Sequence, residues 1–177
     1  FTSQSGNAIT TGEGNVGTTA EAFAALQSSA ELLEALLRAA PTDDGVALEL
    51  ARTRLITARV RYMADSAMDE VARLNAAGLT LLEGVLRRQP DNAIARLWHW
   101  SARVYQAEGD VQDTKFTQAV QQLEQLAAEA PAQRDDPQFP DYRLRVEADI
   151  QRIIGDAYYY GEKKRESSRP SGQTVSP

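Results

Sequence analysis

The stretch Val85-Leu86-Arg87-Arg88-Gln89-Pro90 ends one segment of periodically spaced apolar residues, and a second such segment begins directly after it. Proline cannot continue a helix but suits the first turn of the next one, so this stretch marks a junction between two helices. The same kind of junction recurs at Pro41 and at Pro131. The three prolines lie 49 and 41 residues apart, which leaves room for a helical hairpin in each interval and is typical of helical repeat arrays.

The composition favours an all-α fold with a single core. The chain has 177 residues, of which 42% are hydrophobic and 25% are charged. Alanine and leucine dominate, and both favour helices. No stretch alternates with period two for long enough to predict a strand. We therefore expect antiparallel helical hairpins stacked as a short α-solenoid of about six helices.

The charge and the residue content argue against several classes of partner. The net charge is −6, whereas binding to phosphate backbones needs a basic face, so no nucleic acid is expected as a partner. Cysteine is absent, which removes disulfides and cysteine-based zinc sites. No apolar run approaches the roughly 20 residues of a membrane-spanning helix, so we expect no direct membrane span. No cofactor and no metal are expected.

Both ends of the chain differ in composition from the middle. Residues 1–18 and 163–177 are rich in small polar residues, which predicts a flexible N-terminal arm and a flexible C-terminal tail around a helical domain at 19–162. The chain begins with Phe1 instead of methionine. An exported protein that has lost its leader explains this, and we favour a periplasmic or other extracytoplasmic location; a trimmed cytoplasmic chain is the alternative.

The spacing of apolar residues by three and four predicts six helices, at about 19–39, 44–65, 67–89, 93–109, 113–130 and 141–162. Their ends follow from the capping residues. Thr42-Asp43-Asp44 is expected to cap the second helix and Asp65-Ser66 the third, and Gly109-Asp110 is expected to end the fourth. The stretch from Pro131 to Pro140 contains three prolines and is expected to form a loop.

One part of this pattern carries a family signature. A tryptophan, a small residue, a tyrosine and a Gly-Asp pair follow one another at fixed offsets, at Trp98, Ala102, Tyr105 and Gly109-Asp110. Downstream, an alanine, a bulky apolar residue and a closing proline follow at Ala119, Leu123 and Pro131. With about five residues inserted after the Gly-Asp pair, the segment from Trp98 to Pro131 resembles the tetratricopeptide repeat, a helix–turn–helix unit of about 34 residues.

The resemblance is divergent, since Ser101 and Leu126 stand where the family prefers leucine and alanine. It implies a TPR-like array over 19–162 that binds an extended peptide or a helix of another protein.

A related expectation concerns Gly78 and Ala119, each of which lies twelve positions before a closing proline. Because both fall at the family's small-residue position, we expect each to lie where two helices approach closely.

Three groups of residues are candidates for contact with a partner. Arg52 and Arg59 form one seven-spaced pair on the second helix, and Arg54 and Arg61 form another. Arginines can bind carboxylates in bidentate fashion, although a solvated face balanced by Glu49, Asp65 and Glu70 is the simpler explanation of the pattern. Trp98 and Trp100 point about 200° apart on a helix, so Trp98 is expected to pack in the core and Trp100 to be an exposed aromatic anchor.

The third candidate is the run Tyr158-Tyr159-Tyr160, which spreads over most of a helix circumference. At least one of these tyrosines must leave the core, and Tyr159 and Tyr160 are the candidates for a docking edge. The single histidine, His99, has no nucleophile motif or metal-ligand spacing around it, so no enzyme is expected.

These observations predict a non-catalytic protein–protein interaction module or scaffold. Its partner would be another protein, in the form of a peptide, a helix or a complex subunit. The alternative is an accessory subunit of a larger, extracytoplasmic or membrane-associated assembly of bacterial type, held through its extended tails.

Overall fold

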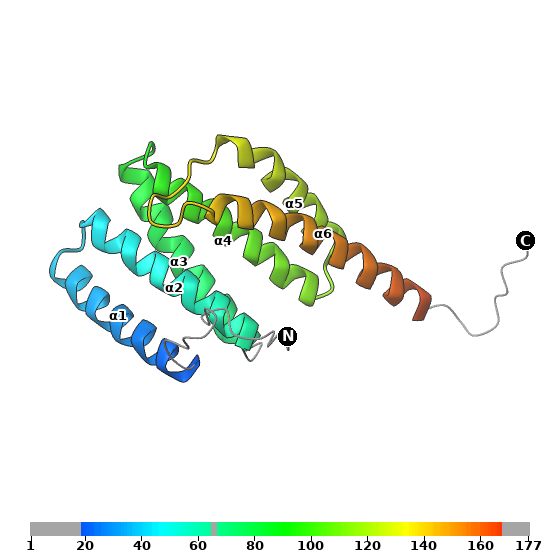
Figure 1. Cartoon of the computed structure of the whole chain (residues 1–177), viewed down its shortest axis with the longest axis horizontal. Helices are drawn as coiled ribbons and strands as arrows, with labels where there is room; N and C mark the ends of the chain where they lie inside the picture. Colours follow the sequence, from blue (N-terminus) through cyan, green and yellow to red (C-terminus); the bar gives the residue numbers. More distant parts are fainter. Residues whose placement is uncertain (1–18, 65–66, 168–177) are drawn as a thin grey trace, which may run out of the picture. The chain divides into compact units, whose positions relative to one another are not determined.

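The protein is an all-α chain in a computed structural model that describes residues 19–64 and 67–167 (Figure 1). Six α-helices and a short 3-10 turn at Ala130–Ala132 occupy these residues, which confirms the predicted fold class. The helices are α1 (Thr19–Ala39), α2 (Asp44–Ala64), α3 (Met68–Arg88), α4 (Ala93–Gln112), α5 (Phe116–Glu129) and α6 (Tyr142–Ser167). Among the described residues, no helix is both long enough and apolar enough to span a membrane.

The predicted bounds hold for the first helices and need correction for the later ones. The proposed arm at 1–18, the cap at Asp65-Ser66 and residues 168–177 lie outside the described residues. Gly109-Asp110 does not end α4, which continues to Gln112, and α6 continues to Ser167, five residues into the expected tail. The extension of α6 has a physical basis, because Lys163 and Lys164 at its end favour the negative end of the helix dipole.

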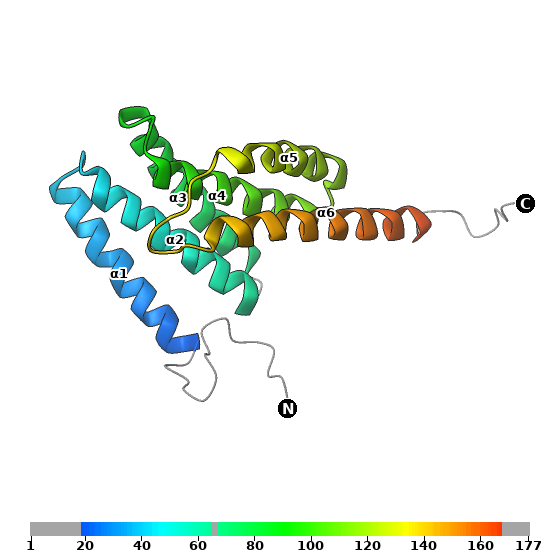
Figure 2. The same ribbon diagram turned by 45° about the horizontal axis from the view of Figure 1, so that its top comes forward.

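The chain divides into two compact units, and the division falls within α4 after Ala102. In the first unit, α1, α2 and α3 follow one another as antiparallel neighbours, and Figure 2 shows α1 at the edge, beside α2. Asp43 caps α2, since its Oδ1 accepts a hydrogen bond of 3.0 Å from the backbone N–H of Val46. Asn92 caps α4 in the same way through the N–H of Ala95. The expected cap of the second helix is thus confirmed.

Gly78 allows α3 to pack closely on α2. The residue is buried, and a Cβ atom added to it would lie 2.9 Å from Cγ and Cδ2 of Leu55 and 3.5 Å from the backbone oxygen of Ala51. Because contacts below 3.0 Å are not tolerated, a larger side chain here displaces Leu55. The expectation that Gly78 lies at a close approach of two helices is confirmed, and Ala119 on α5 is fully buried.

The second unit contains the end of α4 together with α5 and α6. Thr114 follows two residues after the end of α4 and terminates the helix, with a left-handed φ of 66°. The N–H of Thr114 donates to the carbonyl of Val111 and that of Lys115 to the carbonyl of Asp110, the two bonds of a Schellman motif. Gly109 lies inside the helix instead, which explains why the predicted end was wrong.

A polar network joins α4 to α6 in this unit. The Arg152 guanidinium on α6 donates a 2.6 Å hydrogen bond to the buried carboxylate of Glu108. The hydroxyl of Tyr105 donates to Asp149 at 3.0 Å, and Asp149 also accepts from Arg152. Burial opposes the charge on Arg152, but its hydrogen bond to Glu108 and the nearby carboxylates raise its pKa above the usual value. The network therefore holds α6 in register against α4.

Candidate functional site

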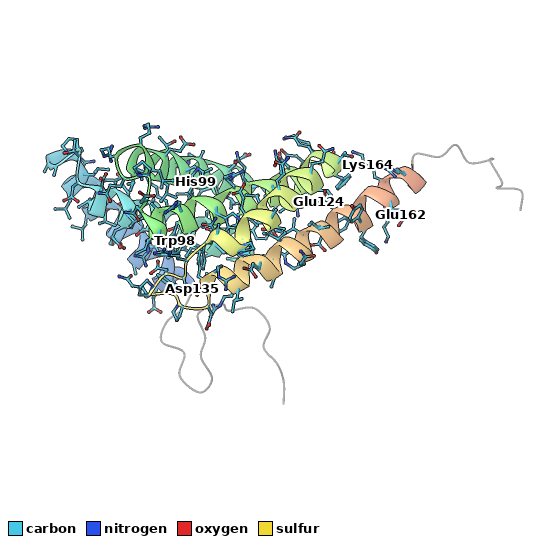
Figure 3. The ribbon with its side chains drawn as sticks, turned by 90° about the horizontal axis from the view of Figure 1, so that it is seen from above. Trp98, His99, Glu124, Asp135, Glu162 and Lys164 are labelled. Atoms are coloured by element: carbon cyan, nitrogen blue, oxygen red, sulfur yellow. The ribbon has the colours of Figure 1, made fainter. Side chains whose placement is uncertain are left out.

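An open groove lies between the first turns of α5 and the last turns of α6. It consists of two adjoining hollows of about 460 and 610 Å³. The hollows share Phe116, Thr117, Gly161 and Arg165, so they form one continuous surface feature. Figure 3 shows Glu124 on α5 and both Glu162 and Lys164 on the last turns of α6, where the groove opens.

The groove has an apolar floor. Val120 of α5 and Ala157 of α6 are buried along it, and Phe116 is half-buried at the start of α5. Gly161 faces the ring of Phe116, and a Cβ atom added to Gly161 would lie 3.5 Å from that ring, an ordinary van der Waals contact. Both residues line both hollows, so they lie where the two hollows meet.

The charges around the groove are unevenly distributed. One hollow is lined by Lys115, Lys164 and Arg165, and the other carries Glu124 and Glu162 beside Arg165. Among the described residues, no carboxylate lines the first hollow. The groove therefore offers a cationic end and an acidic side to anything that binds in it.

Two of these lysines are held in place by neighbouring side chains. Lys164 Nζ donates a 2.9 Å hydrogen bond to Thr114 Oγ1 and lies 6.0 Å from the ring centroid of Phe116. Lys115 Nζ lies 3.0 Å from Asp110 Oδ1 and 3.1 Å from Asp113 Oδ2. Its hydrogen bonds to these two carboxylates raise the pKa of Lys115. Lys115 thus stays protonated at neutral pH.

All three consecutive tyrosines of α6 leave the core, as predicted for at least one of them. Tyr158 lines the groove and is 61% exposed. The rings of Tyr159 and Tyr160 are also exposed and pack edge to face at 5.3 Å, and Lys163 Nζ lies 4.9 Å from the Tyr159 ring centroid. Of the three rings, that of Tyr158 lines the groove, whereas Tyr159 and Tyr160 are exposed outside its lining.

The placement of two other candidates is corrected by the structure. Trp100 was expected to be exposed, but it is 1% exposed, as is Trp98. Opposite sides of α4 are buried, so both tryptophans have a core to enter. Arg52 is only 3% exposed; its guanidinium hydrogen-bonds Glu49 at 2.6 Å and lies 5.4 Å from the Trp98 ring centroid. Neither Trp100 nor Arg52 offers its side chain to the surface.

The remaining arginines of α2 are half-buried and engaged within the first unit. Arg59 lies over the ring of Tyr62 at 5.5 Å. Arg54 donates a 2.8 Å hydrogen bond to Glu34 of α1. Arg61 lies 3.2 Å from a carboxylate oxygen of Glu70 and 4.0 Å from the ring centroid of Phe23. The contacts of Arg54 and Arg61 join α2 to α1 and α3, whereas the contact of Arg59 with Tyr62 lies within α2.

Sequence reasoning missed the residues of α5 that complete the groove, above all Phe116 and Thr117. A signal was available, because Phe116 and Val120 are spaced i and i+4 at the start of a helix. Such spacing is typical of core residues, whereas Phe116 is only half-buried.

No group of three or more metal-ligating side chains gathers anywhere in the ranges that the structure describes. His99 is half-buried on α4, among the residues that flank the two tryptophans. Comparison of the chain with protein-family models, with curated proteins and with solved structures found no match. The groove of α5 and α6 is accordingly the site on which a function can be argued from geometry.

Proposed function

We propose that the protein is a non-catalytic interaction module that binds a helix or an extended segment of another protein in the groove between α5 and α6. The supporting observation is the apolar floor of the groove, formed by Phe116, Val120 and Ala157, beside the exposed ring of Tyr158. In this proposal the chain is a divergent TPR-like scaffold, and its binding surface is the helical array itself.

The chemistry of the groove suggests the character of the bound segment. An apolar side chain of the partner covers the floor, and the rings of Tyr158 and Phe116 supply large contact areas with little loss of side-chain entropy. A carboxylate of the partner lies towards Lys164 and Arg165, where the first hollow is cationic. Tyrosine and arginine are enriched among the residues that dominate binding energies, which agrees with this composition.

A photocrosslinking experiment identifies the partner and locates the contact. Tyr158 is replaced by p-benzoylphenylalanine in the full chain, in cells that produce the protein, and crosslinked chains are identified by mass spectrometry. The matched control carries the same group at Leu144, which is 54% exposed on the same helix but outside the groove. We expect a crosslink to one partner from position 158 and none to that partner from position 144.

Two charge variants on α5 then test whether the groove carries the affinity. Thr117 and Gln125 are both exposed on α5, but only Thr117 lines the groove. We expect Thr117→Glu to weaken binding of the crosslinked partner at least tenfold, because it places a negative charge beside the partner's carboxylate, and Gln125→Glu to leave binding unchanged, as measured by isothermal titration. Equal effects of both variants, or none, would contradict binding in the groove. Binding that disappears on removal of residues 1–18 but survives Thr117→Glu would favour the accessory subunit held by its tails.

A further inference from the structure

Helix α1 is apolar on two faces, and the structure covers only one of them. Its inner face contacts α2 through half-buried residues, Phe23, Leu26, Ala30, Leu33 and Leu37. On the outer face, Leu32 is 68% exposed and Leu36 is 55% exposed. No residue of α1 is buried, whereas a helix that is apolar on both sides is normally covered on both sides.

The outer face is suited to close contact with another helix. Leu32 and Leu36 are four residues apart and therefore adjacent along one side of the helix. Two small exposed residues, Ala35 and Ala39, lie beside them on the same face. Small side chains let two helix backbones approach and leave space for the leucines of the opposing helix. Figure 2 shows the described part of the first unit on one side of α1 only.

Two charges on one edge of this face determine what fits it. Glu31 and Arg38 are exposed on the same edge, seven residues apart, which is two helical turns. Glu31 accepts a hydrogen bond from Gln27 of the same helix, and Arg38 makes no ion pair within 19–64 or 67–167. In an antiparallel pair of identical helices with two-fold symmetry, the same edge of each helix lies beside that edge of the other copy. A contact between residue i of one copy and residue j of the other therefore occurs twice, once in each direction.

We propose that the outer face of α1 is the contact surface of a homodimer, in which α1 of a second copy packs antiparallel against it. With the two-fold axis between residues 34 and 35, Glu31 of each copy lies opposite Arg38 of the other, and Leu32 lies beside Leu36 of the other. The negative and the positive charge of this ion pair are thus both present on α1. A second copy of the chain forms the pair twice, which favours it over a helix of a different protein.

The size of the surface sets the strength of this dimer. With the two-fold axis between residues 34 and 35, the two helices overlap over residues 30–39, a length of about 15 Å, and bury on the order of 500 Å² in total, below the range of stable interfaces. We therefore expect a weak, reversible dimer with a dissociation constant in the submillimolar range, detected by sedimentation velocity over a concentration series of the full chain.

Charge reversal tests both the contact and its register. In Glu31→Arg homodimers, residue 31 meets Arg38 of the other copy with like charge, and in Arg38→Glu homodimers two glutamates meet. Each variant alone should dimerise about tenfold more weakly, since two attractive pairs become repulsive. An equimolar mixture of the two variants restores both ion pairs in a heterodimer, so the mixture should regain dimerisation close to that of the parent chain.

The experiment distinguishes loss of the dimer from loss of the fold. Both residues are exposed, and neither makes a hydrogen bond or an ion pair with a described residue outside α1, so the variants should keep the circular-dichroism spectrum and the melting temperature of the monomer. A parent chain that stays monomeric up to about 1 mM would overturn the proposal. We would expect that result if residues 1–18 or another protein covered this face of α1. A dimer that is insensitive to the single reversals, or a mixture that does not recover, would overturn it equally.

Discussion

The glycine at the contact of α2 and α3 gives the sharpest test of the packing. Gly78 and Gly84 both lie inside α3 and are buried, so replacement of either by alanine gains the same helix propensity, about 1 kcal/mol. At Gly78 the new Cβ atom would lie 2.9 Å from two atoms of Leu55, and at Gly84 it would meet nothing nearer than 3.8 Å. Overpacking a filled site costs about 1–3 kcal/mol.

The two alanine variants should therefore differ in stability by about 1–3 kcal/mol. We expect Gly84→Ala to raise the free energy of unfolding by about 1 kcal/mol, and Gly78→Ala to leave it unchanged or lower it by up to about 2 kcal/mol. For a chain of this size each kcal/mol moves the melting temperature by about 2–4 °C, which thermal melts followed by far-UV circular dichroism resolve. Gly78→Leu should lower it further.

The cause of the penalty can be isolated by removing the opposing side chain. Leu55→Ala costs about 2–5 kcal/mol by itself because it empties a buried site. In that background Gly78→Ala should become stabilising, since the alanine Cβ no longer meets Leu55, and the double-mutant cycle reports the coupling directly. If Gly78→Ala stabilises the parent chain as much as Gly84→Ala does, the close approach at Gly78 is refuted.

Three further predictions concern the second unit. Arg152→Ala should lower the free energy of unfolding by about 2–4 kcal/mol in urea titrations, because it leaves the buried carboxylate of Glu108 without its cation, whereas exposed Arg145→Ala should change it by less than about 0.5 kcal/mol. Thr114→Gly should raise it by about 1 kcal/mol, since glycine adopts the left-handed conformation without steric cost; a lower melting temperature would argue against a strained cap. The raised pKa of Lys115 stabilises the fold fully at pH values below about 10.4, and this contribution is lost as the pH rises through the folded-state pKa, so Lys115→Gln should flatten the alkaline decline in the urea midpoint.

Helix number and most helix ends were predictable because they depend on local chemistry. Prolines exclude helix continuation, and Asp43 accepts from the N–H three residues onward whatever surrounds it. The end of α4 was not predictable in this way. Glycine is the usual left-handed cap, yet Thr114 takes that role while Gly109 stays helical. The preference of a residue type gives an expectation, and the hydrogen bonds of the Schellman motif decide the outcome.

The misplaced site residues share one physical cause. Trp100 was expected to be exposed because the reasoning assumed one apolar stripe for each helix, and α4 is buried around most of its circumference. Arg52 was expected at the surface because arginine is rarely buried, but Glu49 pairs with its charge and the Trp98 ring covers its guanidinium. Burial on several sides depends on tertiary packing, which periodicity along one helix does not report.

The tyrosines were the candidates that sequence reasoning placed at the surface correctly, because three consecutive residues cannot share one face of a helix. That argument is geometric and needs no knowledge of the partner helices. It did not locate the groove, which requires knowing that Gly161 of α6 lies against Phe116 of α5 across 45 residues of chain. Sequence alone therefore identified the exposed aromatic residues, and the fold identified what lies beside them.

The two open apolar surfaces can be tested independently because they belong to different units. Thr117→Glu alters the groove of α5 and α6, and Glu31→Arg alters the outer face of α1. If the groove binds a partner and α1 dimerises, Thr117→Glu should weaken partner binding and leave the dimer intact, and Glu31→Arg should weaken the dimer and leave partner binding intact. A partner that is lost in both variants would instead require dimerisation for binding. In that case the equimolar mixture of Glu31→Arg and Arg38→Glu chains should restore partner binding together with the dimer.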